Sequence, residues 1–157
     1  MKQLRGDASA AVAVPGRDCF AVLRAVEDYP RWYPDVVSRA EVLERGADAL
    51  PTLVQTVVHL GLGPLHHDFR LVMRVDAQAP GRVCLARVPN DPSDEEELTL
   101  AWYIGGSSPT ELRLEVRARL DVPALLPVRG AGDSVARGFL SAACRELKRS
   151  HRGASSA

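Results

Sequence analysis

Residues 111–120 read ELRLEVRARL and alternate between charged and apolar side chains almost without exception. Successive side chains of a β-strand point to opposite faces, so this segment predicts a strand with one apolar and one solvated face. Such a strand belongs in an antiparallel sheet whose apolar face is covered by another element. Any fold for this chain must therefore supply a sheet and something to cover it.

Six further segments have strand patterns and are separated by turns, most of them rich in glycine and proline. Most consecutive strands are joined by short turns, which favours hairpin pairing and argues against a parallel βαβ arrangement. We therefore expect an antiparallel sheet of six or seven strands. The further segments are residues 8–14, 36–45, 52–60, 65–75, 82–88 and 97–104.

Residues 133–149, with the sequence DSVARGFLSAACRELKR, are the best candidate to cover the sheet. At 3.6 residues per turn this segment has one apolar and one polar side, which predicts an amphipathic helix. Asp133 can cap its first amides, and the cations near its end suit the negative end of the helix dipole. The apolar side consists of Val135, Ala136, Phe139, Leu140, Ala142, Ala143 and Leu147.

A shorter helix is expected after the first strand, where Cys19, Phe20, Leu23 and Val26 recur at helical spacing. The sequence DYPRWYPD follows at residues 28–35. Its two prolines exclude a regular helix through this piece, so we expect a turn or a single helical turn.

Composition limits the class of protein. A chain of 157 residues fits one domain, which we expect to span residues 1–157 with a core of about 8–150. Its 20 basic and 20 acidic residues cancel, so no nucleic-acid partner is expected. We see neither a signal peptide nor a membrane span. Three scattered cysteines suggest a reducing compartment, and we expect a cytoplasmic protein.

The order of elements resembles the helix-grip proteins of the START/SRPBCC superfamily, most closely its coenzyme Q-binding and polyketide cyclase-like branch. The resemblance is carried by Val14-Pro15, by Phe20 and Leu23, and by the segment Asp28-Tyr29-Pro30-Arg31-Trp32-Tyr33-Pro34. That segment looks like the tyrosine-proline turn of the family, with its acidic residue shifted by one position. The similarity in layout extends over residues 8–150.

This resemblance implies an α+β helix-grip fold, in which an antiparallel sheet of six or seven strands curls around the long C-terminal helix. In the family, a cavity between sheet and helix holds an apolar ligand. Ala136, Ala142 and Ala143 on the inner side of the expected helix are consistent with such a cavity. They are equally consistent with close packing of the helix on the sheet.

His67 is the first candidate for ligand contact. Strand alternation places it in a row with Phe69, Leu71, Met73 and Val75, so we expect it to face the core. There it could hydrogen-bond the polar head of a ligand, or it could be a core histidine satisfied by a neighbour. We expect recognition to be dominated by apolar burial, with this one polar anchor.

The other candidate ligand-binding residues are large side chains expected on inward faces or in the aromatic turn. Each could line a cavity, and each could equally be core or a packing plug. They are Trp32, Phe69, Met73, Trp102 and Phe139.

Motifs for metals, cofactors and nucleophiles are absent from the sequence. The adjacent His66 and His67 point to opposite faces of a strand and cannot chelate together, so no metal is expected. There is no G-x-S-x-G, P-loop or GxGxxG sequence, and no cofactor is expected. Arg87 shares its parity with Val83 and Leu85, and on an inward face it would need an anionic partner or ligand group.

Together with the resemblance, these observations favour a protein that binds a hydrophobic small molecule such as a lipid, isoprenoid or aromatic polyketide, for transport or sequestration. The first alternative is an enzyme of the polyketide cyclase or aromatase kind, in which polar groups in the same cavity move protons. His67 is the single well-placed ionisable residue, which favours binding over catalysis. The second alternative is ribosome association, which one branch resembling the sequence shows and which only the basic residues 145–152 support.

Overall fold

The computed structural model describes residues 1–62, 65–107, 109–122 and 129–155. Its strands form one seven-stranded antiparallel sheet in the order β1-β7-β6-β5-β4-β3-β2. The chain therefore meanders from β2 to β7, and the first strand pairs with the last. The strands are β1 (Lys2–Val12), β2 (Val37–Arg45), β3 (Pro51–Leu62), β4 (Leu65–Gln78), β5 (Arg82–Arg87), β6 (Glu97–Gly105) and β7 (Thr110–Leu120).

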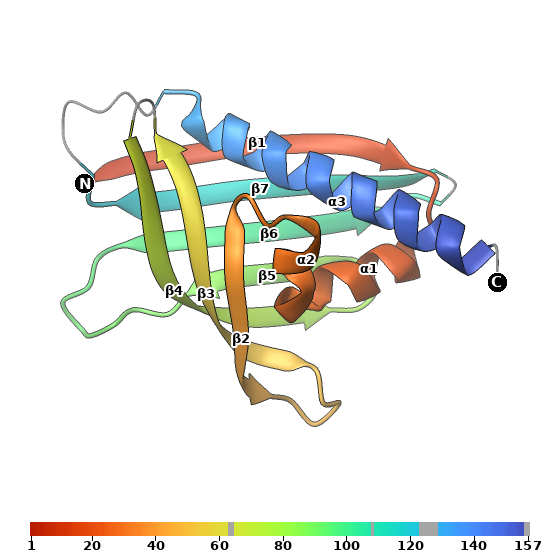
Figure 1. Ribbon diagram of the computed structural model, residues 1–157, viewed down its shortest axis with the longest axis horizontal. Coiled ribbons are helices and arrows are strands. Elements are labelled where there is room, and N and C mark those ends of the chain that lie inside the picture. The colour runs from red at the N-terminus through yellow and green to blue at the C-terminus, as the bar shows by residue number, and fades with distance from the viewer. Residues whose placement is uncertain (63–64, 108, 123–128, 156–157) are drawn as a thin grey trace.

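The sheet curves around the C-terminal helix α3 (Ala131–Ser155) (Figure 1). In Figure 1, β1, β7 and β6 run along the long axis, while β2, β3 and β4 turn away from that direction. The helix packs mainly on β1 and β7, at one edge of the sheet. This is the α+β helix-grip arrangement predicted from the sequence, with seven strands.

Two short helices, α1 (Gly16–Arg24) and α2 (Tyr29–Trp32), lie beside α3 and are joined by a 3₁₀ turn, η1 (Val26–Asp28). The segment with two prolines thus contains one short helical turn, as predicted. The hydroxyl of Tyr29 donates to the carbonyl of Leu23 at 2.6 Å, which fixes α2 against α1.

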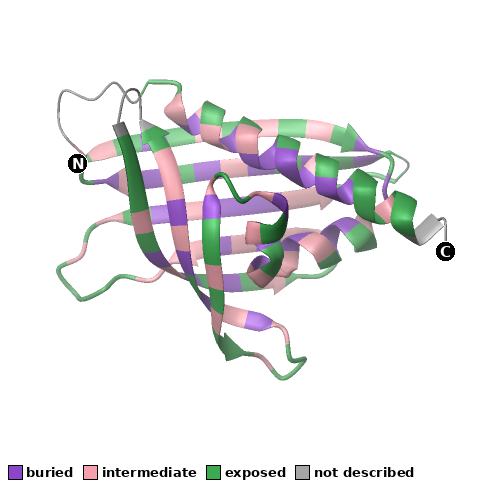
Figure 2. Ribbon diagram, in the orientation of Figure 1, coloured by how far each residue is buried: buried purple, intermediate pink, exposed green. Residues whose placement is uncertain are grey.

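The predicted alternation is confirmed most clearly in β7 (Figure 2). The apolar residues of β7 are buried, and the charged residues between them lie on the solvated face. Burial of the apolar row against α3 and the neighbouring strands is the main stabilising contribution of this strand. The buried residues of β7 are Thr110, Leu112, Leu114, Val116, Ala118 and Leu120.

The largest differences from the predicted boundaries are in the first strand and the last helix. The first strand starts at Lys2 rather than at residue 8, because its backbone pairs with β7 without a break from Lys2↔Leu120 to Val12↔Thr110. Backbone pairing needs no apolar side chains, so the hydrophobic pattern did not mark this extension. Likewise, α3 runs from Ala131 to Ser155 instead of over 133–149, because the additional residues continue the helix without an apolar stripe.

The first turn of α3 lies directly on β1, with backbone against backbone. A Cβ atom at Gly6 would overlap the backbone of Gly132, and one at Gly132 would overlap the carbonyl of Arg5. Only glycine permits this approach at both positions. The N–H of Asp7 donates to Oδ1 of Asp133 at 3.1 Å, so this carboxylate binds β1 although it was expected to cap the helix. These contacts set where the helix begins on the sheet.

A buried carboxylate ties α3 to α2. Glu146 is only 5% exposed and pairs with Arg149 of its own helix at 2.8 Å and with Arg31 of α2 at 3.0 Å. The hydrogen bonds from Arg149, and then the charge of Arg31, hold the pKa of Glu146 below its usual value. The carboxylate therefore stays ionised at neutral pH, and both arginines are held against the helix end.

Candidate functional site

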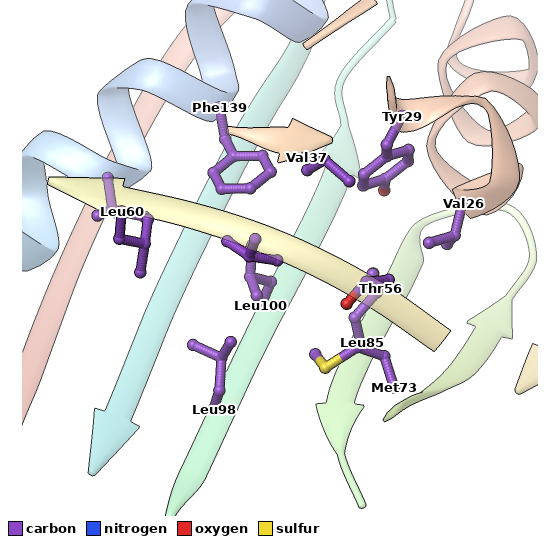
Figure 3. A pocket seen from close by; sticks show the side chains of 12 residues that line it. Val26, Tyr29, Val37, Thr56, Leu60, Met73, Leu85, Leu98, Leu100 and Phe139 are labelled. Atoms are coloured by element: carbon purple, nitrogen blue, oxygen red, sulfur yellow. The ribbon is translucent and has the colours of Figure 1, made fainter. Parts of the chain in front are cut away.

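An apolar cavity of about 40 Å³ lies between the sheet and the helices, and we call it the inner chamber (Figure 3). Its walls come from β2 to β6, from η1 and α2, and from α3. Phe139 points into this space from the helix (Figure 3). The lining residues are Val26, Tyr29, Val37, Thr56, Val58, Leu60, Met73, Leu85, Leu98, Leu100, Val135 and Phe139.

The hydroxyl groups that line the inner chamber are already engaged by the protein. Thr56 donates to the carbonyl of Leu71 at 3.0 Å, and Tyr29 donates to Leu23. Burial raises the pKa of Tyr29, so its phenol stays neutral. A small cavity with satisfied polar groups favours apolar atoms over water.

A second hollow of about 600 Å³ opens beside the chamber, and we call it the outer groove. It lies between the start of α3, the end of β3 and the connection from α2 to β2. Leu60, Val135 and Phe139 line both hollows and therefore separate them. The other lining residues are Tyr33, Val36, His59, Gly61, Arg129, Gly130, Ala131, Ser134 and Arg137.

Tyr33 holds Phe139 in its position between groove and chamber. The two rings meet edge to face, with their centroids 4.9 Å apart. A Cβ atom at residue 138 would overlap the Tyr33 hydroxyl, so Gly138 is what lets this phenol lie against the helix. Gly138 lowers the stability of the helix by about 1 kcal/mol relative to alanine, and in exchange it leaves space for the Tyr33 side chain.

The volumes of the two hollows indicate which of them is large enough for a small-molecule ligand. Pockets for drug-sized ligands measure about 300–1,000 Å³. The outer groove is in this range at about 600 Å³, whereas the inner chamber, at about 40 Å³, is mostly filled by its own side chains. A ligand in the groove reaches the chamber only when Phe139 or its neighbours move.

The predicted site residues are distributed over several places. Met73 and Phe139 line the inner chamber. Trp32 and Trp102 are buried in the core and are not among the residues that line either hollow, and Phe69 is partly buried. The fold therefore brings two of the five large side chains to the cavity.

The interior position predicted for His67 is wrong. This residue is exposed near the outer end of β4, where its ring packs edge to face on Phe69 with centroids 4.6 Å apart. Alternation correctly assigns His67 to the face of Leu71 and Met73. It does not show that β4 runs past the covered part of the sheet, which leaves this end of the row in solvent.

His59 is the histidine that the structure places in the outer groove. Its Nδ1 lies 2.6 Å from Oδ1 of Asp68, and its ring stacks on His66 with centroids 5.4 Å apart. The sequence contained a partial signal for this pair, because a hairpin between the adjacent strand segments 52–60 and 65–75 brings His59 close to Asp68, its partner in the β3–β4 ladder. Arg129 and Arg137 had no such signal, since the groove joins segments that are distant in sequence.

The side chain of Arg87 is buried, which was the condition under which the sequence required an anionic partner, and that partner is a protein carboxylate. The side chains of Arg87 and Asp94 are 6% and 10% exposed, and their nitrogen and oxygen atoms are 2.6 Å apart. Arg87 also donates to the carbonyl of Glu96 at 2.8 Å. The acidic loop after β5 thus neutralises this arginine, and the guanidinium is not needed for a ligand.

Replacing Asp94 with asparagine should change how stability depends on pH. The hydrogen bond from Arg87 holds the pKa of Asp94 below its ordinary value. A lowered folded pKa stabilises the fold above the unfolded value of about 4, and this contribution is lost as the pH falls below it. We expect Asp94→Asn to be less stable than wild type at pH 7, with a difference that shrinks towards pH 3. Urea midpoints at a series of pH values measure this difference.

The control is Glu95→Gln, which removes an exposed carboxylate from the same loop. It should leave the pH dependence close to that of wild type. Parallel stability curves for Asp94→Asn and wild type between pH 7 and pH 3 would show that the pair makes no such contribution.

Other kinds of site find no support in the described part of the chain. No three histidine, cysteine or acidic side chains there are arranged to hold a metal ion. No described helix has the length and apolar character needed to cross a membrane. Cys19, Cys84 and Cys144 are free thiols.

Comparison with known proteins agrees with this architecture. A family model described as polyketide cyclase/dehydrase and lipid transport matches residues 12–144. No curated protein matches the sequence. The solved structures include a START superfamily protein from Mycobacterium smegmatis, with a TM-score of 0.71 and 15% identity over 92% of this chain and 97% of that one.

Two further similar structures carry names that describe what they do. The Zhui aromatase/cyclase from Streptomyces sp. R1128 has a TM-score of 0.68 and 16% identity, covering 98% of both chains. A STAR-related lipid transfer protein from Xanthomonas axonopodis has a TM-score of 0.62 and 16% identity, covering 90% of this chain and 84% of that fragment. At these identities the likeness establishes the fold alone.

The START/SRPBCC resemblance read from the tyrosine-proline turn is thus confirmed, whereas the narrower coenzyme Q-binding branch stays a prediction. The family match spans most of the chain, from the end of β1 into α3. The fold, with a sheet curved around a C-terminal helix and an apolar chamber between them, agrees with that match. This protein belongs to the polyketide cyclase/dehydrase and lipid transport family.

Proposed function

We propose that this protein binds a hydrophobic small molecule that lies in the outer groove and extends an apolar end into the inner chamber. The observation that carries this proposal is the shared wall of Leu60, Val135 and Phe139, which places an apolar chamber directly beside a groove of ligand size. A lipid, an isoprenoid or an aromatic polyketide has suitable chemistry. The free thiols fit a role in a reducing compartment such as the cytoplasm.

Apolar burial is sufficient to drive such binding. Covering ~250 Å² of apolar ligand surface at about 25 cal/mol per Å² contributes roughly 6 kcal/mol before the losses of association. Moving Phe139 aside reduces this gain, because its contacts with Tyr33 must be given up. Affinity should therefore increase with the apolar area of the ligand.

Uptake of the neutral dye N-phenyl-1-naphthylamine tests this proposal. We expect fluorescence enhancement with wild type, and at least tenfold weaker binding with Val58→Phe, since a bulkier ring at Val58 would occupy the chamber. The matched control is Val57→Phe on the opposite face of the same strand, which should bind the dye like wild type. Circular dichroism shows whether each variant keeps its fold.

Absence of dye binding by folded wild type would contradict a binding function. Equal loss of binding in both variants would show that the dye does not use the inner chamber.

A second candidate function is catalysis of the cyclase or aromatase kind, and the His59–Asp68 pair favours it. Asp68 engages Nδ1, which leaves the other ring nitrogen of His59, a residue of the groove wall, to accept or donate a proton. In this function, His59 would be the ionisable group that moves protons, a role that the sequence suggested for His67. With one such pair at the rim of an apolar site, binding without catalysis has the stronger support.

The variant His59→Gln separates the two functions. If the protein only binds its ligand, this variant should keep the dye affinity of wild type, and neither protein should convert a poly-ketone substrate. If it is a cyclase, the variant should give a different product distribution from that substrate. Ribosome association is supported least, because Arg149 of the basic segment is paired with Glu146.

A further inference from the structure

The charged side chains that line the outer groove are cationic. Arg129 and Arg137 are exposed on its wall, and no aspartate or glutamate is among its described lining residues. Asp68, the carboxylate in contact with His59, is engaged by Nδ1 of that ring. The charges of Asp35 and Arg145 have opposite effects on the pKa of Tyr33, a residue that lines the groove. The groove therefore presents positive charge to whatever occupies it.

Arg129 and Arg137 differ in their ion pairing from several other arginines of the described structure. Arg24, Arg31 and Arg87 each form an ion pair with a carboxylate. Arg137 instead donates to the neutral hydroxyl of Ser134 at 3.3 Å. Within the described residues, no ion pair is formed by Arg129 or Arg137. Both guanidinium groups retain donors for an external acceptor.

The apolar wall and the cations belong to the same hollow. Leu60, Val135 and Phe139 separate the groove from the inner chamber, and Arg137 and Arg129 lie on the side that is open to solvent. A molecule that fits both has an apolar chain and an anionic end. Guanidinium groups bind the oxygens of carboxylates and phosphates particularly well, because their planar donors match two acceptor oxygens.

We propose that the ligand is an amphiphile with a single oxyanion head group, a carboxylate or a phosphate monoester, bound by Arg129 and Arg137. Its apolar chain points toward Phe139 and the inner chamber. This inference rests on the proposed binding function and specifies the class of ligand. Because both arginines are exposed, water and salt weaken the attraction, and the head group selects among ligands of equal chain length.

Displacement of N-phenyl-1-naphthylamine by ligands with identical twelve-carbon chains tests this inference. The ligands are dodecanoate, dodecyl phosphate and dodecanol, used at pH 7.5 below the concentrations at which they form micelles. We expect wild type to bind at least one of the two anions about tenfold more tightly than the alcohol, because only the anions accept charge-assisted hydrogen bonds from the two guanidinium groups. The preferred anion distinguishes a carboxylate ligand from a phosphate ligand.

The double variant Arg129→Gln/Arg137→Gln should lose this preference while binding dodecanol as wild type does. The control Arg74→Gln removes one exposed arginine of β4 that does not line the groove, and it should keep the preference. Raising the salt concentration should reduce the preference of wild type and leave dodecanol binding unchanged.

The outcomes separate this inference from the proposed function. Equal binding of all three ligands by wild type, or an anion preference that survives in the double variant, overturns the inference and leaves apolar binding intact. Failure of every ligand, including dodecanol, to displace the dye overturns the proposed function together with the inference.

Discussion

Replacing Phe139 with alanine should lower the free energy of unfolding by about 3–5 kcal/mol. The side chain is 4% exposed, packs on Tyr33 and lines both the inner chamber and the outer groove. Its removal enlarges an existing cavity, and the cost of such truncations rises with the volume left empty. Urea denaturation followed by circular dichroism measures the change.

Ser141→Ala is the matched control, because Ser141 is exposed on the same helix, and its effect should stay within about 0.5 kcal/mol. The Phe139 variant should also bind the dye faster, since the wall between groove and chamber is removed. A stability loss below about 1 kcal/mol would show that this side chain does not contribute to the core.

Replacing Gly6 with alanine should destabilise the fold by about 3 kcal/mol or more, at the upper end of what overpacking costs. The new Cβ would overlap the backbone of Gly132, and backbone atoms cannot rotate away as the end of a flexible side chain can. The start of α3 must then move off β1, which breaks the hydrogen bond between Asp7 and Asp133. Hydrogen exchange of the Asp7 amide reports this local change, and urea denaturation reports the global one.

The control for this variant is Gly153→Ala near the end of α3, where a Cβ would meet no atom within 4 Å. It should be neutral or stabilise the protein by up to about 1 kcal/mol, because alanine favours a helix more than glycine does. If Gly6→Ala were as stable as wild type with a protected Asp7 amide, the contact between helix and strand would be looser than the structure shows.

The groove and the chamber together have a consequence for binding kinetics. Leu60, Val135 and Phe139 separate the two hollows, and Tyr33 packs on Phe139. Burial raises the pKa of Tyr33, so its phenol is neutral at physiological pH. The side chains around the chamber pack against one another when no ligand is bound. A ligand that enters the chamber must replace those contacts. Slow association with strong dependence on chain length is the expected signature of such a site.

The sequence by itself determined the elements and their inward faces. The alternation in residues 111–120 and the helical period of residues 133–149 predicted β7 and α3, because the backbone geometry of each element links side-chain direction to position. The order of elements, together with the tyrosine-proline turn, carried the resemblance to the superfamily. Burial of Leu114 and Phe139 follows from those patterns without knowledge of any neighbour.

Only the tertiary structure decided which of these faces is covered and what lies next to what. Alternation assigned His67 to the core-facing row, yet the row continues beyond the core, and His59 lies in the groove instead. The contact of β1 with α3 joins residues 126 positions apart, at Asp7 and Asp133. Periodicity is a local property of the chain, whereas a cavity is made where distant segments meet, and for that reason the site had to be read from the fold.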